Sequence, residues 1–188
     1  SVGRLKAAAA LVFTSPFLPM IFQGEEWAAS TPFLYFCNHA DPALAEKVRQ
    51  GRRAEFPVFS SNPEQIPDPQ AEETFLRSKL IWEEVGSPGH ADLLDWHKRL
   101  IRLRKSNPEL CDGRMESVRA RCDETTRCLM VERGEWTVVC NLGPESLKTK
   151  LGDGAHEIAM ASQAGIMEEP PMITLPPDSV AILGPHRS

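Results

Sequence analysis

The chain has 188 residues, of which 41% are hydrophobic and 25% charged, a composition typical of a soluble globular protein with one ordinary domain or two small ones. Its net charge of −5 argues against a protein that binds nucleic acid or an anionic membrane through clustered basic residues. Its longest apolar stretch, around Ala7–Phe13, is too short to span a bilayer. Five scattered cysteines without a CxxC pair indicate reduced thiols of a cytoplasmic protein, with no disulfides and no zinc site.

The first two predicted elements are a helix and a strand. Residues Arg4–Thr14 predict a helix, since Leu5, Ala8 and Val12 recur at helical spacing and would share its buried face. The apolar run Pro19–Gly24 follows without alternation, which predicts a strand buried on both faces, as in a parallel sheet. A buried helical segment is the alternative, but the run is short and bounded by proline and glycine. A helix followed by a buried strand is one repeat of an α/β architecture.

A long connection over Glu25–Pro88 comes next. It predicts short helices after Asp41 and after Asp68, because each aspartate precedes a proline and would cap a helix that begins there. Its aromatic content is too high for a disordered linker.

The clearest helix in the sequence is predicted over Gly89–Lys105. Four large apolar residues recur there at spacings of three and four and predict one buried face: Leu93, Trp96, Leu100 and Leu103. Arg104 lies in the last turn, where the helix dipole favours a cation.

The rest of the chain predicts short strands separated by turns, as in an antiparallel sandwich. The expected strands are Met115–Cys122, Cys128–Arg133, Trp136–Leu142, Leu147–Leu151, His156–Met160, Met172–Leu175 and Val180–Leu183. In the first of them Val118, Ala120 and Cys122 alternate with arginines, which predicts one buried and one wet face. So small a sheet is expected to pack against the preceding helix. The predicted domains are therefore residues 1–110 and residues 111–188.

In this order the pieces resemble the carboxy-terminal end of an α-amylase-type glycoside hydrolase. The residues that carry the resemblance are Thr14–Trp27 (TSPFLPMIFQGEEW), Ala29–Phe33 and the Pro67–Gln70 loop, with support from Thr74-Phe75, Ser78-Lys79-Leu80 and Trp82. The resemblance implies an α/β plus all-β fold. It would comprise the end of a TIM-type (β/α) barrel, with its last strand and helices, followed by a small antiparallel β-sandwich domain.

Within that family the likeness is strongest to the trehalohydrolase branch. These enzymes cleave the α-1,4 bond next to the trehalose end of maltooligosyl trehalose, which makes an α-1,4-glucan or maltooligosyl trehalose the implied ligand, without a cofactor. Two alternatives stay open: a branching enzyme or other α-amylase relative, and a non-catalytic carbohydrate-binding module. The family's catalytic carboxylates follow barrel strands four, five and seven and are expected before Ser1, so no residue of this chain is predicted to be catalytic.

The candidate substrate-binding residues directly follow the predicted strand: Gln23, Glu25, Glu26 and Trp27. In barrels of this kind the active site lies at the carboxyl ends of the strands. An indole stacks on apolar sugar faces, and carboxylates accept hydrogen bonds from hydroxyls. The alternative is that the glutamates are loop charges and the tryptophan packs under the long connection.

Three further expectations concern residues outside that segment. The stretch Asn38–Asp41 (NHAD) resembles a catalytic motif of the family, but Asp41 is better explained as a helix cap. His90 and His97 are interpreted as structural, since no carboxylate or thiol stands at metal-ligand spacing from them. If Pro19–Gly24 lacks neighbouring strands, we expect it to be disordered, rearranged, or paired with a second copy in a dimer.

Overall fold

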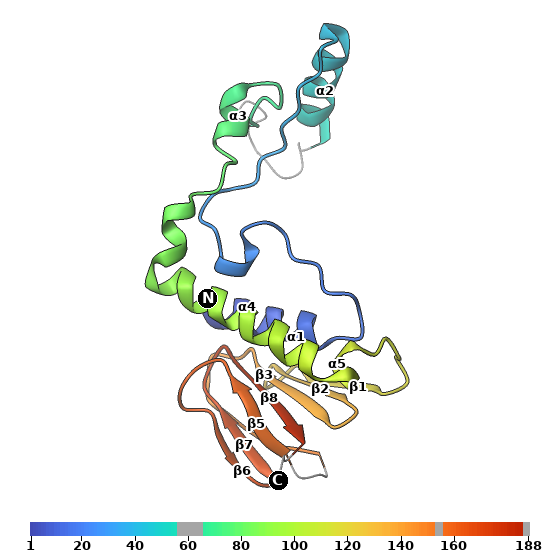
Figure 1. Ribbon diagram of the computed structural model, residues 1–188, viewed down its shortest axis with the longest axis vertical. Helices are drawn as coiled ribbons and strands as arrows, with labels where there is room; N and C mark the ends of the chain where they lie inside the picture. The colour runs from blue at the N-terminus through green and yellow to red at the C-terminus, as the bar shows by residue number, and fades with distance from the viewer. Residues whose placement is uncertain (56–65, 153–155, 186–188) are drawn as a thin grey trace. The chain divides into compact units, whose positions relative to one another are not determined.

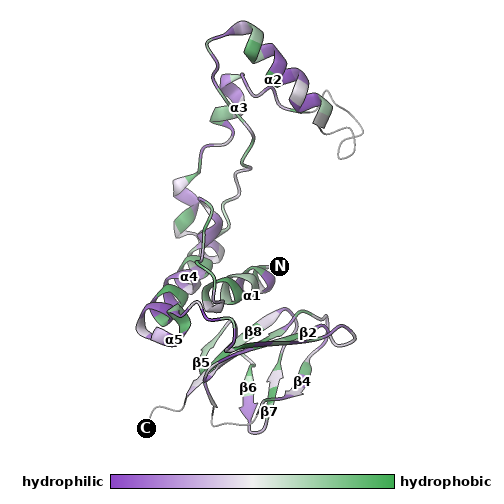
Figure 2. Ribbon diagram, turned by 90° about the vertical axis from the view of Figure 1, so that its right-hand side faces the viewer, coloured by the Kyte–Doolittle hydropathy of each residue, from purple (hydrophilic) through white to green (hydrophobic). Residues whose placement is uncertain are grey.

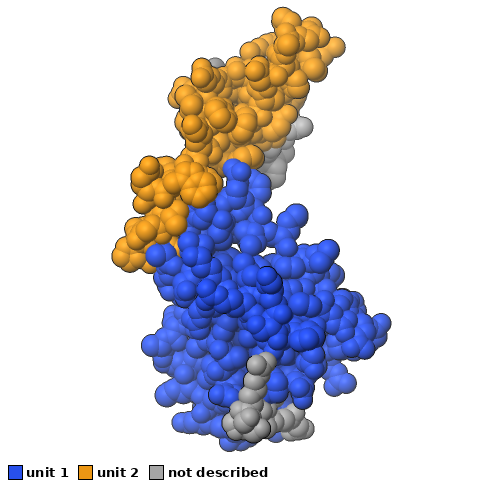
Figure 3. All heavy atoms as spheres, in the orientation of Figure 1, with its two compact units in different colours: residues 1–27, 91–188 blue, residues 28–90 orange. Residues whose placement is uncertain are grey.

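The structure is a computed structural model that describes residues 1–55, 66–152 and 156–185. The chain divides into two compact units, unit 1 with residues 1–27 and 91–188, and unit 2 with residues 28–90 (Figure 3). Of its helices in the described part, none is both long and apolar enough to cross a membrane. The helical elements are α1 (Val2–Thr14), η1 (Glu25–Trp27), α2 (Pro42–Glu55), α3 (Glu72–Leu76), η3 (Trp82–Gly86), α4 (Pro88–Ser106) and α5 (Pro108–Cys111).

Unit 1 contains two antiparallel sheets (Figure 1). The strands are β1 (Val118–Asp123), β2 (Cys128–Arg133), β3 (Trp136–Asn141), β4 (Leu147–Lys150), β5 (His156–Ala161), β6 (Met167–Glu169), β7 (Met172–Leu175) and β8 (Ser179–Pro185). Five strands pair in the order β1-β2-β3-β8-β5, and three pair in the order β4-β7-β6. The predicted antiparallel sandwich is confirmed, and β6 is a strand that the sequence pattern did not indicate.

The core of the sandwich lies between the two sheets. Val139 of β3 stands opposite Ala181 of β8 in the register, and both are completely buried there with Ile173 and Leu175 of β7. Because side chains alternate along a strand, Val138 and Ile182 point to the other face of the five-stranded sheet. That face is covered by helices.

The helices α1 and α4 form a third layer on that second face (Figure 2). The Trp96 indole of α4 is 2% exposed, and its Nε1–H donates a hydrogen bond of 3.0 Å to the carbonyl of Lys6 in α1. The Lys6 ammonium in turn donates to the carbonyl of Ser162, next to β5, at 2.9 Å. The predicted helix is confirmed as α4, and of its predicted buried face Leu93, Trp96 and Leu100 are buried, whereas Leu103 is half-buried. The small β-structure is thus covered by the helix layer, as expected.

The buried face of α1 is not the one that we predicted from the sequence. Leu5 and Val12 are exposed, as is Ala8, whereas Ala7, Ala10 and Phe13 are buried. This helix is apolar over most of its surface, so helical spacing fits two faces equally well. The alanine side has small side chains, and we attribute its burial to the closer approach that they allow to the sheet.

The predicted strand Pro19–Gly24 is not a strand in the structure. These residues follow α1 without regular secondary structure and end in a turn, and no described strand pairs with them. A β-strand is stabilised by hydrogen bonds to at least one neighbouring strand, and none of the described strands pairs with this segment. A barrel remnant is therefore not observed.

The edge strand β1 also differs from its predicted pattern. Ala120 and Cys122 are exposed like the arginines between them, and Val118 is only half-buried. Strand β1 lies at the edge of the five-stranded sheet and pairs only with β2. The alternation therefore marks a strand correctly but not a buried face.

Unit 2 has a small aromatic cluster of its own. Phe36 lies against Phe33 and Phe75, with ring centroids 5.8 and 5.2 Å apart. The guanidinium of Arg52 lies 4.8 Å from the centre of the Tyr35 ring. The helix predicted after Asp41 is confirmed as α2, and the one predicted after Asp68 begins later, as α3.

Candidate functional site

The candidate segment Gln23–Trp27 is a tight turn that leads into η1. Gly24 has a φ of 83°, a left-handed conformation that favours glycine. The Glu25 backbone N–H donates to the carbonyl of Phe22 at 3.0 Å, and the Phe22 N–H donates to the Glu25 carboxylate at 3.0 Å. This reciprocal pair of hydrogen bonds helps to hold the turn, and the Trp27 N–H donates to the Gly24 carbonyl at 3.4 Å.

The four predicted substrate-binding residues differ in exposure. Gln23 and Glu25 are exposed, and Glu26 is half-buried. One carboxylate oxygen of Glu26, Oε2, is buried without a hydrogen-bond partner among the described residues. Trp27 is 3% exposed, so its ring has no open face for a sugar in this structure. Contact between these residues and a substrate stays a prediction.

Two buried arginines hold the chain that leads to this turn. Arg104 of α4 donates to the carbonyls of Phe13 and Ser15 at 2.7 and 2.8 Å, and to that of Phe17 at 3.0 Å. It thereby pairs carbonyls at the end of α1, which have no partner inside that helix. The sequence indicated only a cation near a helix end, and nothing in the local pattern showed that Arg104 would be buried.

Arg133, the last residue of β2, is the second of these arginines and is 3% exposed. It donates to the carbonyls of Thr14 and Ser15, each at 2.7 Å, to Leu110 at 3.2 Å, and also to Asp112. Burial, and then the like charge of Arg104, lower the pKa of Arg133 from its ordinary value. The pair ties the end of α1 to α4, to α5 and to the first sheet.

In unit 2 the stretch Asn38–Asp41, which resembles a catalytic motif, leads into helix α2, and Asp41 caps that helix. The Asp41 carboxylate accepts from the Ala43 N–H at 2.8 Å, at the start of α2. His39 is held by its backbone N–H, which donates to the Gln70 side chain at 3.1 Å. Gln70 belongs to the Pro67–Gln70 loop, where Asp68 pairs with Arg49 at 2.8 Å. The cap interpretation of Asp41 is confirmed.

Other reactive side chains are accounted for by packing. The Nδ1 of buried His97 lies 2.9 Å from the carbonyl of Leu93, and its ring meets Phe13 edge-on. Burial raises the pKa of the Cys140 thiol to about 12 and also raises that of Cys128, so neither forms a thiolate near neutral pH. In residues 1–55, 66–152 and 156–185, no three His, Cys, Asp or Glu side chains gather in a way that could hold a metal ion.

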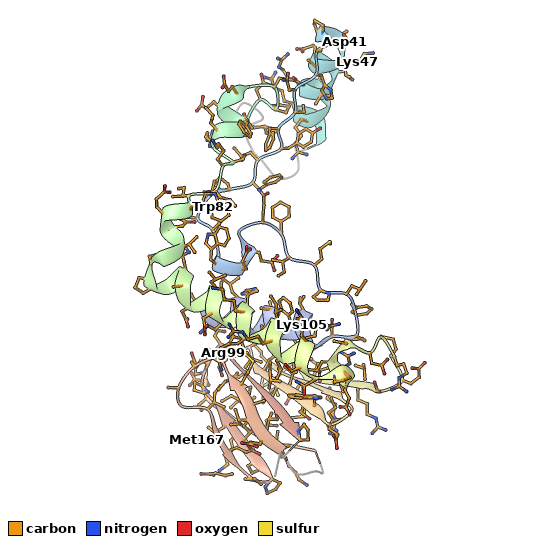
Figure 4. The ribbon with its side chains drawn as sticks, viewed as in Figure 1. Asp41, Lys47, Trp82, Arg99, Lys105 and Met167 are labelled. Carbon is orange, nitrogen blue, oxygen red and sulfur yellow. The ribbon has the colours of Figure 1, made fainter. Side chains whose placement is uncertain are left out.

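A groove of about 590 Å³ lies elsewhere in unit 1. Its walls come from α4, with Arg99 (labelled in Figure 4) and Arg102, and from β5 and β8, and Trp136 also lines it. Trp136 is 4% exposed and therefore presents little ring surface to a ligand. None of the residues that line this groove belongs to Gln23–Trp27.

Comparison with known proteins gives relatives for nearly the whole chain. A family described as a domain of unknown function (DUF3459) matches residues 113–182. A malto-oligosyltrehalose trehalohydrolase of Brevibacterium helvolum is 38% identical over 183 residues, which are 97% of this chain and 31% of that protein. One of Mycobacterium tuberculosis is 42% identical over 143 residues, which are 76% of this chain and 25% of that protein.

Solved structures give the same relationship. A putative alpha amylase from Salmonella typhimurium matches 97% of this chain and 30% of its own, with 28% identity and a TM-score of 0.76. An alpha-amylase from H.orenii matches 99% of this chain and 36% of its own with a TM-score of 0.58, which at 18% identity shows the fold alone. The chain is therefore a relative of the malto-oligosyltrehalose trehalohydrolases, with the fold of the carboxy-terminal part of α-amylases, and spans 25% to 31% of the length of the two curated relatives.

Proposed function

We propose that this chain serves as the carboxy-terminal part of a glycoside hydrolase that releases trehalose from maltooligosyl trehalose. The observation that supports this most is the 38% identity to the Brevibacterium helvolum relative, which extends over almost the full chain. The candidate segment Gln23–Trp27 and the Pro67–Gln70 loop both lie inside that match, which covers 97% of the chain.

In this proposal the chain contributes to substrate binding and not to bond cleavage. Glycoside hydrolysis needs two carboxyl groups on either side of the scissile bond. Glu25 and Glu26 are neighbours in one turn, and the Glu25 carboxylate already accepts a hydrogen bond from the Phe22 N–H. The acid and the nucleophile would come from a polypeptide region that corresponds to the rest of the relatives.

The alternative functions are those of a branching enzyme or other α-amylase relative and of a carbohydrate-binding module. A branching enzyme or another α-amylase relative has a similar fold but would form branched glucan instead of trehalose. A carbohydrate-binding module would need an exposed aromatic platform on the β-sandwich, and its single tryptophan, Trp136, is buried. The trehalohydrolase proposal is favoured because the curated relatives cited above carry that name.

The proposal predicts a binding defect when the candidate carboxylates are changed. In a chimera that joins this chain to the unmatched remainder of the Brevibacterium helvolum relative, Glu26→Gln should raise the KM for maltooligosyl trehalose about tenfold, with kcat nearly unchanged. Loss of one hydrogen bond from a charged acceptor to a substrate hydroxyl accounts for that size. Steady-state assays of released trehalose measure both constants.

Glu124→Gln is the matched control, since Glu124 is an exposed glutamate in the turn between β1 and β2 and should leave both constants unchanged. A fall in kcat at constant KM would make Glu26 part of the chemistry instead. Unchanged constants for both Glu25→Gln and Glu26→Gln would remove this turn from the substrate site.

A further inference from the structure

The groove between α4 and the strands β5 and β8 has the volume of a small-molecule site. It encloses about 590 Å³, and ligand pockets in proteins usually measure roughly 300–1,000 Å³. Part of its lining is apolar and comes from three elements: Leu103 of α4, Ile158 and Met160 of β5, and Pro185 of β8. The groove can therefore accommodate the apolar part of a ligand as well as a polar group.

The sheet side of the groove is tightly packed. A Cβ atom built on Gly184 would lie 2.6 Å from the Trp136 ring, closer than real Cβ atoms approach, so glycine is required for the ring to lie against this strand. The ring covers the strand there and is itself only 4% exposed. A wall that is fixed by packing changes little when a ligand enters, which lowers the entropic cost of binding.

The side of the groove that α4 forms is basic. Arg99, Arg102 and Ser106 stand three and four residues apart and therefore share one face of the helix. Among the residues that the structure describes, neither arginine has a carboxylate partner and the Ser106 hydroxyl has no hydrogen-bond partner, while the Arg99 guanidinium lies 5.7 Å from the centre of the Trp96 ring. Glu157 is the one carboxylate in the described lining, so positive charge is in excess. Two guanidinium groups and a hydroxyl on one face favour an anion.

A β-bulge in β5 lies in the same groove. Ile158 pairs with Leu183 and Met160 pairs with Ile182, so Ala159 between them has no opposite residue in the register of β8. The extra residue of a bulge stands outside the ladder of hydrogen bonds, and bulges are frequent next to active sites. Ala159 is one of the residues that line the groove. This independent feature marks the groove as a site, and not as a chance gap between a helix and a sheet.

We propose that this groove binds a small phosphorylated molecule, with the phosphate group paired to Arg99 and Arg102 and the rest of the molecule against the apolar side chains of β5 and β8. A phosphate monoester has three acceptor oxygens that two guanidinium groups can share, whereas a carboxylate has two. The dipole of α4 opposes an anion at this end of the helix with about half an elementary charge, which the two full charges outweigh. The inference goes beyond the proposed function, because none of the lining residues belongs to Gln23–Trp27.

Isothermal titration calorimetry of the purified chain tests the proposal with four probes: glucose-6-phosphate, adenosine monophosphate, inorganic phosphate and glucose. We expect at least one of the two phosphate esters to bind more tightly than inorganic phosphate, because only an ester reaches the apolar side chains. The ester that binds more tightly identifies whether the ligand is a sugar phosphate or a nucleotide. Glucose, which has no phosphate, should not bind.

Arg102→Gln should weaken binding of the tighter ester about tenfold or more, because it removes a charge-assisted hydrogen bond. Arg102 is exposed, so the unfolding midpoint of this variant should not change. In nuclear magnetic resonance spectra of the original chain, the amide signals of Ser106 and Ala159 should shift as the ester is added. Shifts confined to residues outside the groove would overturn the proposal.

Lys105→Gln is the matched control. Lys105, labelled in Figure 4 like Arg99, is an exposed cation of the same helix that does not line the groove, so its removal should leave the affinity unchanged. The proposal is also overturned if this control weakens binding as much as Arg102→Gln does. The same holds if neither ester binds more tightly than inorganic phosphate, or if glucose binds as tightly as glucose-6-phosphate.

Discussion

Trp96→Ala should lower the free energy of unfolding by about 3–5 kcal/mol, as expected for a large aromatic side chain removed from a packed interior. The indole is 2% exposed and joins α4 to α1 through its hydrogen bond to the Lys6 carbonyl. The Lys6 ammonium and the Arg99 guanidinium each lie 5.7 Å from the centre of its ring. Chemical denaturation followed by circular dichroism measures the loss.

Trp96→Phe separates the packing from the hydrogen bond. It keeps most of the ring but removes the N–H, so it should cost about 1 kcal/mol plus a smaller loss of packing. A midpoint that Trp96→Ala leaves unchanged would show that α4 does not support the sandwich.

Arg133→Met should be the second strongly destabilising substitution, with a loss of about 2–4 kcal/mol. It leaves carbonyls of Thr14, Leu110 and Asp112 without the donor that pairs them, and each unpaired buried group costs about 1–3 kcal/mol. Relief of the repulsion with Arg104 offsets part of the cost, as replacement of buried charges often does. The measurement is again the free energy of unfolding.

Arg121→Met is the control for that substitution, because Arg121 lies exposed on the edge strand β1 and pairs there with Glu132. Exposed ion pairs contribute little, so a change within about 1 kcal/mol is expected. Arg133→Lys should recover only part of the stability, since an ammonium cannot serve several carbonyls as a guanidinium does. Equal effects of Arg133→Met and Arg121→Met would contradict the role given to Arg133.

The sequence predicted best the elements that are determined by residues close to one another in the chain. The bounds of β2 were predicted correctly, because an apolar run there ends at a turn that contains Gly134, with a φ of 57°. Strand β6 was missed, since Met167-Glu168-Glu169 has no apolar alternation and lies at a sheet edge. The predicted buried face of α1 was wrong, because two faces of this helix are apolar. The surface against which the helix packs decides which of them is buried.

Local sequence patterns did not predict the features that depend on residues far apart in the chain. Pro19–Gly24 has the composition of a buried strand, but a strand needs neighbours that the composition cannot supply. The burial of Arg133 follows from carbonyls of residues more than a hundred positions earlier. For the candidate site, the sequence indicated the Gln23–Trp27 turn after the apolar run. It left open whether Trp27 would be buried, as it is, and did not indicate that one oxygen of Glu26 would lack a partner among the described residues.

The most direct test of the account is the trehalose released from maltooligosyl trehalose by the purified chain alone, compared with the chain in complex with the unmatched remainder of the Brevibacterium helvolum relative. We predict no release above background from the chain alone, because its candidate carboxylates, Glu25 and Glu26, are neighbours in one turn and do not flank a bond as an acid and a nucleophile must. Release should appear with the complex. Turnover by the chain alone that survives further purification and disappears in Glu25→Gln or Glu26→Gln would contradict the account.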